Sequence, residues 1–121
     1  MRLLLTISLL CCVGSALAGG VRMLIYRAPL AGSQYYAVTE LWPELKTGDL
    51  LTLVREPDNR HDGAAIRVDW HGRKLGYLPR ASNRAVSAAM DAGNRLIARI
   101  SRLSDDADPW RRVEVEVLAE L

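Results

Sequence analysis

Apolar and polar residues alternate in several short runs of this chain, a spacing typical of β-strands that bury one face. The clearest runs are residues 66–70 and 112–117. The run at 50–55 is apolar at nearly every position, so we expect that strand to be buried on both faces. Altogether, strands are predicted at residues 35–38, 50–55, 66–70, 74–79, 95–103 and 112–117.

One pair of these strands is predicted to form a hairpin. The dipeptide His71-Gly72 supplies its turn, because glycine tolerates the positive φ that such turns need. In the returning strand, strict alternation places Leu75 and Tyr77 on one face and Lys74 on the other.

Helical spacing is confined to one stretch. Ser82 is a suitable N-cap, apolar residues recur at helical spacing over 85–90, and Gly93 is expected to end the helix. Residues 42–45 are predicted to form a turn or a single helical turn. The sequence therefore predicts a mostly β fold: a small six-stranded, partly open barrel with one main α-helix and a short helical turn.

Residues 1–18 have the layout of a secretory signal peptide, in which a basic start at Arg2 precedes an apolar stretch and small residues. We expect cleavage after Ala18, a periplasmic or secreted protein, and no stable membrane insertion after cleavage. An uncleaved anchor is the alternative, but the apolar stretch is short for a bilayer. The large residue before Cys11 argues against a lipidated cysteine.

The rest of the chain is predicted to form one domain. Residues 19–32 are expected to be a lead-in or an edge strand, residues 33–118 the domain itself, and residues 119–121 a tail. Half of the chain is apolar and a quarter is charged, as in globular proteins. Because the mature chain has no cysteine, its core alone must stabilise it, and we expect a monomer without cofactor or metal.

Positive charge is concentrated in the middle of the chain. The formal net charge is only +2, but basic residues outnumber acidic ones over 55–84, whereas acidic residues dominate from Asp105 onward. A basic region of this kind favours binding of an anion. Nearly all the basic residues are arginines, which suits bidentate phosphate contacts, although the base composition of a genome also raises the arginine content.

A polar loop follows the strand at 50–55, and it gathers donors, acceptors and an imidazole ring on what should be a rigid sheet. The strand after the hairpin turn then ends at a proline. Together these segments resemble the HIRAN domain, and the resemblance covers about residues 33–118. Its motifs are Arg55-Glu56-Pro57-Asp58-Asn59-Arg60-His61-Asp62-Gly63-Ala64-Ala65-Ile66 and Leu75-Gly76-Tyr77-Leu78-Pro79.

The resemblance implies a function. HIRAN domains occur in helicase-like DNA-repair proteins and as stand-alone bacterial proteins. In the helicase-like members the domain resembles a small nucleic-acid-binding barrel that captures the 3′ end of single-stranded DNA. The implied binding surface comprises Tyr35, Tyr36, Arg55, Asn59, Arg60, His61, Asp62, Tyr77 and Arg80.

The resemblance also implies roles for these residues. Tyrosine rings stack on bases, the three arginines rim the surface, and Asp62 accepts a hydrogen bond from a free 3′ hydroxyl. His61 stands where the family usually has an aromatic ring. Alternatively, Asn59 and Asp62 cap turns by bonding to nearby backbone amides, and both tyrosines of the pair belong to the core.

The chain departs from the family pattern at three positions. Gln34 replaces the arginine that precedes the tyrosine pair in members that capture DNA. Arg60 replaces a proline and adds positive charge, and Ala64 replaces an asparagine.

The residues do not favour an enzyme. His61 and Asp62 are adjacent, and adjacent residues of an extended segment point to opposite sides, so neither readily orients the other. Both cysteines lie in the predicted signal peptide, and the two histidines have no metal-ligand spacing. Two functions remain: an exported module that binds single-stranded DNA or its 3′ end, or an envelope module that binds a protein or peptide with the same scaffold.

Overall fold

The computed structural model describes residues 20–121, so the predicted signal peptide lies outside the described residues. The strands are β1 (Arg22–Pro29), β2 (Leu50–Arg55), β3 (Ile66–Trp70), β4 (Arg73–Tyr77), β5 (Leu96–Leu103) and β6 (Val113–Glu120). The α-helices are α2 (Val38–Leu41) and α3 (Arg84–Asp91), and the 3-10 helices are η2 (Ser33–Tyr35), η3 (Trp42–Glu44) and η4 (Pro109–Arg111). None of the helices in the described part is long and apolar enough to cross a membrane.

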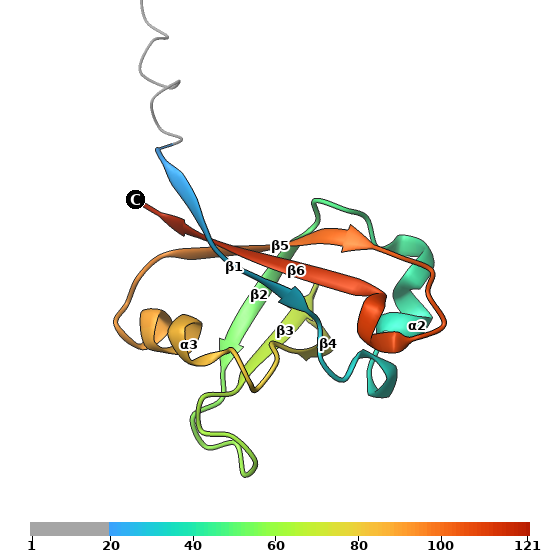
Figure 1. Cartoon of the computed structure of the whole chain (residues 1–121), viewed down its shortest axis with the longest axis horizontal. Coiled ribbons are helices and arrows are strands. Elements are labelled where there is room, and N and C mark those ends of the chain that lie inside the picture. The colour runs from blue at the N-terminus through green and yellow to red at the C-terminus, as the bar shows by residue number, and fades with distance from the viewer. Residues whose placement is uncertain (1–19) are drawn as a thin grey trace, which may run out of the picture.

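All six strands belong to one antiparallel sheet with the order β1-β6-β5-β2-β3-β4. The strands β1, β6 and β5 form a long layer, and β2, β3 and β4 cross it at a steep angle (Figure 1). The two parts are joined where Leu50 and Leu51 of β2 pair with β5. Of the two alternatives expected for residues 19–32, a lead-in or an edge strand, the structure has the edge strand, β1, paired with β6.

The sheet is not closed, but its two edges meet at one point. Ala31, just after β1, forms a bridge with Tyr77 of β4 through two backbone hydrogen bonds of 2.8 and 3.0 Å. The neighbouring Gly76 lies so close to the carbonyl oxygen of Ala31 that a Cβ atom would not fit there. The predicted fold class, a six-stranded, partly open barrel, is confirmed.

The core lies between the two parts of the bent sheet. Alternation along β6 directs Val113, Val115 and Val117 inward, as the pattern predicted, and all three are buried. The α-helix α3 adds Val86 to the same cluster. The other fully buried apolar side chains are Leu30, Val38, Ile66, Val68, Leu75, Leu78 and Ile100.

The prediction of a strand at 35–38 is wrong. Gly32, with φ of 75°, turns the chain into η2, and α2 follows from Val38. The tyrosines and valine favour strands by intrinsic propensity, but the tertiary contacts are stronger. The amide of Ala37 bonds to the carbonyl of Lys74 in β4, so this segment packs across the sheet edge without becoming a strand.

Two smaller predictions also fail. The strand β2 begins buried on one face only, since Leu51 is buried whereas Leu50, on the opposite face, is 69% exposed. The N-cap of α3 is Asn83, and Ser82 bonds instead to the hydroxyl of Tyr26, 2.8 Å away. The helix end at Gly93, the hairpin turn at 71–72 and the helical turn after Leu41 are confirmed.

The strand β4 contains a bulge that changes which residues share a face. Val68 of β3 pairs with Gly76, whereas the next residue, Asp69, pairs with Lys74, so Leu75 is the extra residue. Lys74 therefore lies on the same face as Tyr77, contrary to the alternation predicted from the sequence.

Candidate functional site

The polar loop between β2 and β3 is held in shape by its own side chains. The Asn59 Oδ1 atom accepts hydrogen bonds from the amides of His61 (2.8 Å) and Asp62 (3.2 Å). The Asp62 Oδ1 atom accepts one from the amide of Ala64 at 2.9 Å. These bonds are the turn-capping contacts named above as the alternative role of Asn59 and Asp62.

Arg55 fastens the loop to helix α3. Its Nε and Nη2 atoms donate to the two carboxylate oxygens of Asp91 at 2.9 and 3.1 Å, and its guanidinium also reaches the carbonyls of Gly63 and Ala65. The hydrogen bond from Arg55 lowers the pKa of Asp91. The Arg55 side chain is only 16% exposed, so it lies beneath the loop.

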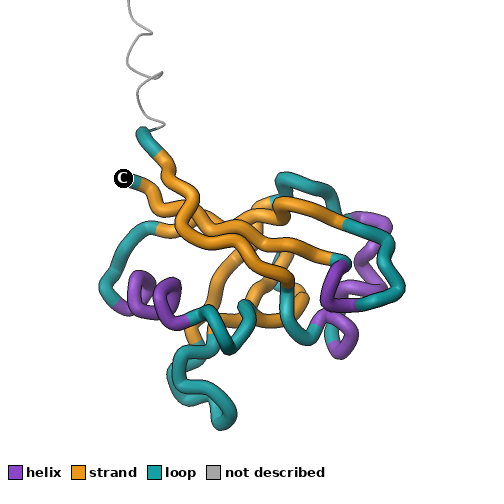
Figure 2. Tube along the Cα trace, viewed as in Figure 1, coloured by secondary structure: helices purple, strands orange, loops and turns teal. Residues whose placement is uncertain are grey.

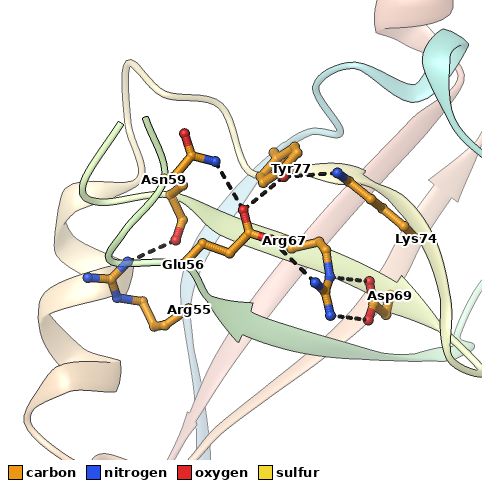
Figure 3. Close-up of polar contacts among 8 residues, drawn as sticks. Arg55, Glu56, Asn59, Arg67, Asp69, Lys74 and Tyr77 are labelled. Carbon is orange, nitrogen blue, oxygen red and sulfur yellow. Dashed lines mark hydrogen bonds and ion pairs between the residues drawn. The ribbon is translucent and has the colours of Figure 1, made fainter. Parts of the chain in front are cut away.

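Glu56 lies at the centre of a second network, drawn in Figure 3. Its carboxylate accepts hydrogen bonds from Asn59 Nδ2 at 3.0 Å, from the Tyr77 hydroxyl at 2.8 Å and from Arg67 at 3.3 Å. Burial raises the pKa of Glu56, but the bonds from Asn59 and Tyr77 and the charges of Lys74 and Arg67 outweigh it. The net pKa shift is downward.

Lys74 positions the two tyrosines. Its ammonium group donates to the Tyr77 hydroxyl at 2.9 Å, and it lies 4.1 Å from the ring centroid of Tyr36 and 4.6 Å from that of Tyr77. The two rings meet edge to face, with centroids 6.2 Å apart and planes at 64°. Hydrogen bonds thus run from Lys74 through Tyr77 to Glu56, and they fix the Tyr77 ring in position.

These contacts border a groove of about 280 Å³ between the loop and the sheet edge. One wall is aromatic, because Tyr36 and Tyr77 line it, and Asp62 and Arg80 supply opposite charges. An aromatic wall beside an acceptor and a cation suits a planar group that carries a donor and a negative charge. The lining residues are Ala31, Tyr36, Asn59, His61, Asp62, Ala65, Tyr77, Leu78 and Arg80.

Six of the nine site residues predicted from the sequence line this groove together, and three lie outside it. Arg55 lies under the loop, and Arg60 is exposed on it without lining the groove. Tyr35 is 76% exposed on η2, next to the groove residue Tyr36.

Asp62 has a buried neighbour that the sequence did not indicate. Asn83, only 1% exposed, donates from Nδ2 to Asp62 Oδ2 at 2.9 Å. This bond, the amide of Ala64 and the charges of Arg80 and Arg84 lower the pKa of Asp62, so its carboxylate is charged at neutral pH. No residue of the described part donates to the Asn83 Oδ1 atom.

Sequence reasoning missed the apolar lining residues Ala31, Ala65 and Leu78, and three polar residues that support the site: Glu56, Lys74 and Asn83. For Asn83 the sequence contains a usable signal, because this residue directly follows Ser82, the predicted N-cap of the helix. For Lys74 no local signal exists, because the bulge at Leu75 places it. Among residues 20–121, no cluster of histidine, cysteine and acidic side chains could hold a metal ion.

Comparison with known proteins gives one family and two solved structures. The model of the HIRAN domain family matches residues 24–121. A crystal structure of a protein from Lactobacillus plantarum superposes with a TM-score of 0.70 and 26% identity, over 84% of this chain and 98% of that one. The HIRAN domain of human HLTF superposes with a TM-score of 0.60 and 19% identity, over 82% of this chain and 78% of that one. No curated protein matches the chain.

Proposed function

Because this chain belongs to the HIRAN domain family, a family of DNA-binding modules, we propose that it binds single-stranded DNA and holds the 3′ end in the groove. The observation that carries the proposal is the groove itself. Residues from the polar loop, from β4 and from the segment after β1 converge there, so two tyrosine rings, a carboxylate and an arginine face one space.

Each part of the groove fits one part of a nucleotide. The rings of Tyr36 and Tyr77 offer a stacking surface, and stacking on an aromatic ring contributes about 1–3 kcal/mol per base. Arg80 is exposed in the turn that follows β4 and suits a phosphate. Arg60 adds a second exposed cation on the loop, so positive charge is available although Gln34 replaces the family's arginine.

Asp62 is the residue that makes the groove prefer a DNA end with a free 3′ hydroxyl. A carboxylate close to phosphates is repulsive unless it accepts a hydrogen bond from a hydroxyl. The Asp62 carboxylate is charged, lines the groove and already accepts one bond at each oxygen, and each oxygen can accept another. A free 3′ hydroxyl is the donor that a DNA end supplies.

The test is a titration of the domain, residues 20–121, with matched oligonucleotides that end in a 3′ hydroxyl or a 3′ phosphate. We expect the wild type to prefer the hydroxyl end. Asp62→Ala should weaken binding of the hydroxyl end by about tenfold, since hydrogen bonds to charged groups are strong, and should spare or tighten binding of the phosphate end.

The control is Asp58→Ala, which removes the same charge from the same loop but outside the groove, and it should leave the preference unchanged. Equal weakening of both ends by Asp62→Ala would mean that Asp62 only holds the loop. If the wild type binds neither oligonucleotide at low salt, the groove serves a protein or peptide of the envelope.

We further propose that the protein acts outside the cytoplasm, on the strength of the signal-like residues 1–18. Mass spectrometry of the protein from its native cells should find Gly19 as the first residue. Recovery of a membrane-bound form that retains Met1 would contradict export by cleavage.

A further inference from the structure

A second hollow, of about 260 Å³, lies where the chain passes from β5 to β6. Like the first groove, it combines an aromatic ring, a carboxylate, arginine and apolar surface. Its lining residues are Pro29, Arg102, Trp110, Arg111, Val113 and Glu114.

The ring of Trp110 is unusually open to solvent. Its backbone is fixed, because the amide donates to Asp108 Oδ1 at 3.1 Å and Pro109 begins the 3-10 turn. The side chain nevertheless remains 48% exposed. The fold thus keeps a large aromatic ring exposed to solvent on a rigid turn, as base stacking requires.

The most exposed tyrosine and tryptophan residues lie at one end of the molecule. Among residues 20–121, the three most exposed tyrosine or tryptophan side chains are Tyr35 (76%), Trp110 (48%) and Tyr36 (38%). The buried Ser33 of η2 donates to the carbonyl of Pro109 in η4 at 3.2 Å, which joins the segments that carry them. The short helices at 33–35 and 109–111 lie side by side beyond the sheet (Figure 2).

The second hollow is close to the groove. Ala31 lines the groove, Pro29 lines the hollow, and Leu30 between them is buried. Residues two apart on an extended segment point to the same side, so both openings lie on the outer side of this segment. The Cα atoms of Pro29 and Ala31 are at most about 7 Å apart, because an extended chain spans about 3.3–3.6 Å per residue.

The arginines of the hollow are available for phosphates. Arg102 and Arg111 have side chains 64% and 71% exposed, and their nearest carboxylates, on Glu114 and Asp108, are each 3.9 Å away. The charge of Glu114 is offset by Arg27, at 3.7 Å, and by a hydrogen bond from Ser101. The surface therefore suits an anion that also carries exposed planar groups.

We propose that the hollow around Trp110 is a second nucleotide subsite, an inference that rests on the proposed function. A single strand whose 3′ end occupies the groove continues past Tyr35, and one of its preceding bases stacks on Trp110 while Arg102 and Arg111 contact the phosphates. A duplex does not fit this description, because its bases are already stacked on each other. Tyr35, which does not line the groove, gains a role along this path.

The experiment measures binding of 3′-hydroxyl oligothymidines of two lengths, about three and ten nucleotides, to the wild type and to Trp110→Ala. The wild type should bind the longer strand more tightly. Trp110→Ala should lose about fivefold or more of the affinity for the longer strand and none for the shorter, since only the longer strand reaches the second hollow. Trp110→Phe, which keeps a ring, should retain most of the gain.

The outcomes separate this inference from the proposed function. If the wild type binds the short strand but gains nothing from added length, or if Trp110→Ala weakens both lengths equally, the second subsite is overturned and the first remains. If the wild type binds neither length, both fail. As a charge control, Arg95→Ala removes an arginine that is 83% exposed, precedes β5 and does not line the hollow, and it should preserve the length effect that Arg102→Ala reduces.

Discussion

Replacing Gly76 with alanine should destabilise the fold by about 2–4 kcal/mol, the larger of the two stability effects that we expect. The added Cβ would overlap the carbonyl oxygen of Ala31 and would lie 3.0 Å from Leu30 Cγ. Neither neighbour can yield easily, because Ala31 is held by the two bridge hydrogen bonds and Leu30 is buried in the core. The bridge that joins the sheet edges must therefore open or shift.

Urea unfolding followed by circular dichroism measures this effect. The urea concentration at the unfolding midpoint should fall, while the slope of the unfolding free energy against urea concentration stays unchanged. The matched control is Gly63→Ala, because a Cβ there would meet only the carbonyl of Pro57, at an ordinary 3.9 Å, and the residue does not have positive φ. A stable Gly76→Ala protein with an unchanged groove would show that the bridge is not needed to hold the two edges together.

Replacing Glu56 with glutamine should cost about 1–3 kcal/mol of stability at neutral pH, because three donors lose their charged acceptor. Asn59 and Tyr77 can still donate to the amide oxygen of glutamine, but the amide nitrogen then opposes the Arg67 guanidinium. Glu44→Gln, at an exposed glutamate of η3, is the control and should change stability little.

The pH dependence gives this prediction a second readout. The folded-state pKa of Glu56 is lowered, so the folded state favours the ionised form more than the unfolded chain does. Its contribution is complete above the unfolded pKa, about 4.3, and is lost as the pH falls through the folded pKa. The stability gap between wild type and Glu56→Gln should therefore be widest near neutrality and narrow below about pH 4. A gap that stays constant down to acid pH would mean that the Glu56 charge does not stabilise the fold.

The sequence predicted the parts of the site that depend on local geometry. The loop, the hairpin turn at His71-Gly72 and the returning strand follow from residues close together in the chain, although β4 ends at Tyr77 and the predicted strand ran to Pro79. Asn59 and Asp62 combine two predicted properties, since they line the groove and also cap the turns of their own loop.

The rest depended on contacts that a pattern does not contain. The bulge at Leu75 reverses the face of Lys74, and no residue type marks a bulge there. Glu56 gains its central place from Tyr77, 21 residues away in sequence, and from Arg67, 11 residues away. The segment after Gly32 is helical because its backbone bonds to β4, although its side chains favour a strand.

The fastening of the loop by Arg55 and its own side chains has a consequence for how a ligand arrives. If a loop becomes ordered only when the ligand binds, the conformational entropy that it loses weakens the affinity. The required ordering also lowers the association rate. Here the chain has already lost that freedom on folding, since Arg55 bonds both to the loop carbonyls of Gly63 and Ala65 and to Asp91 of α3. The loop side of the groove is thus formed before any ligand is present, and under the proposed function an approaching strand needs only to collide in the right orientation.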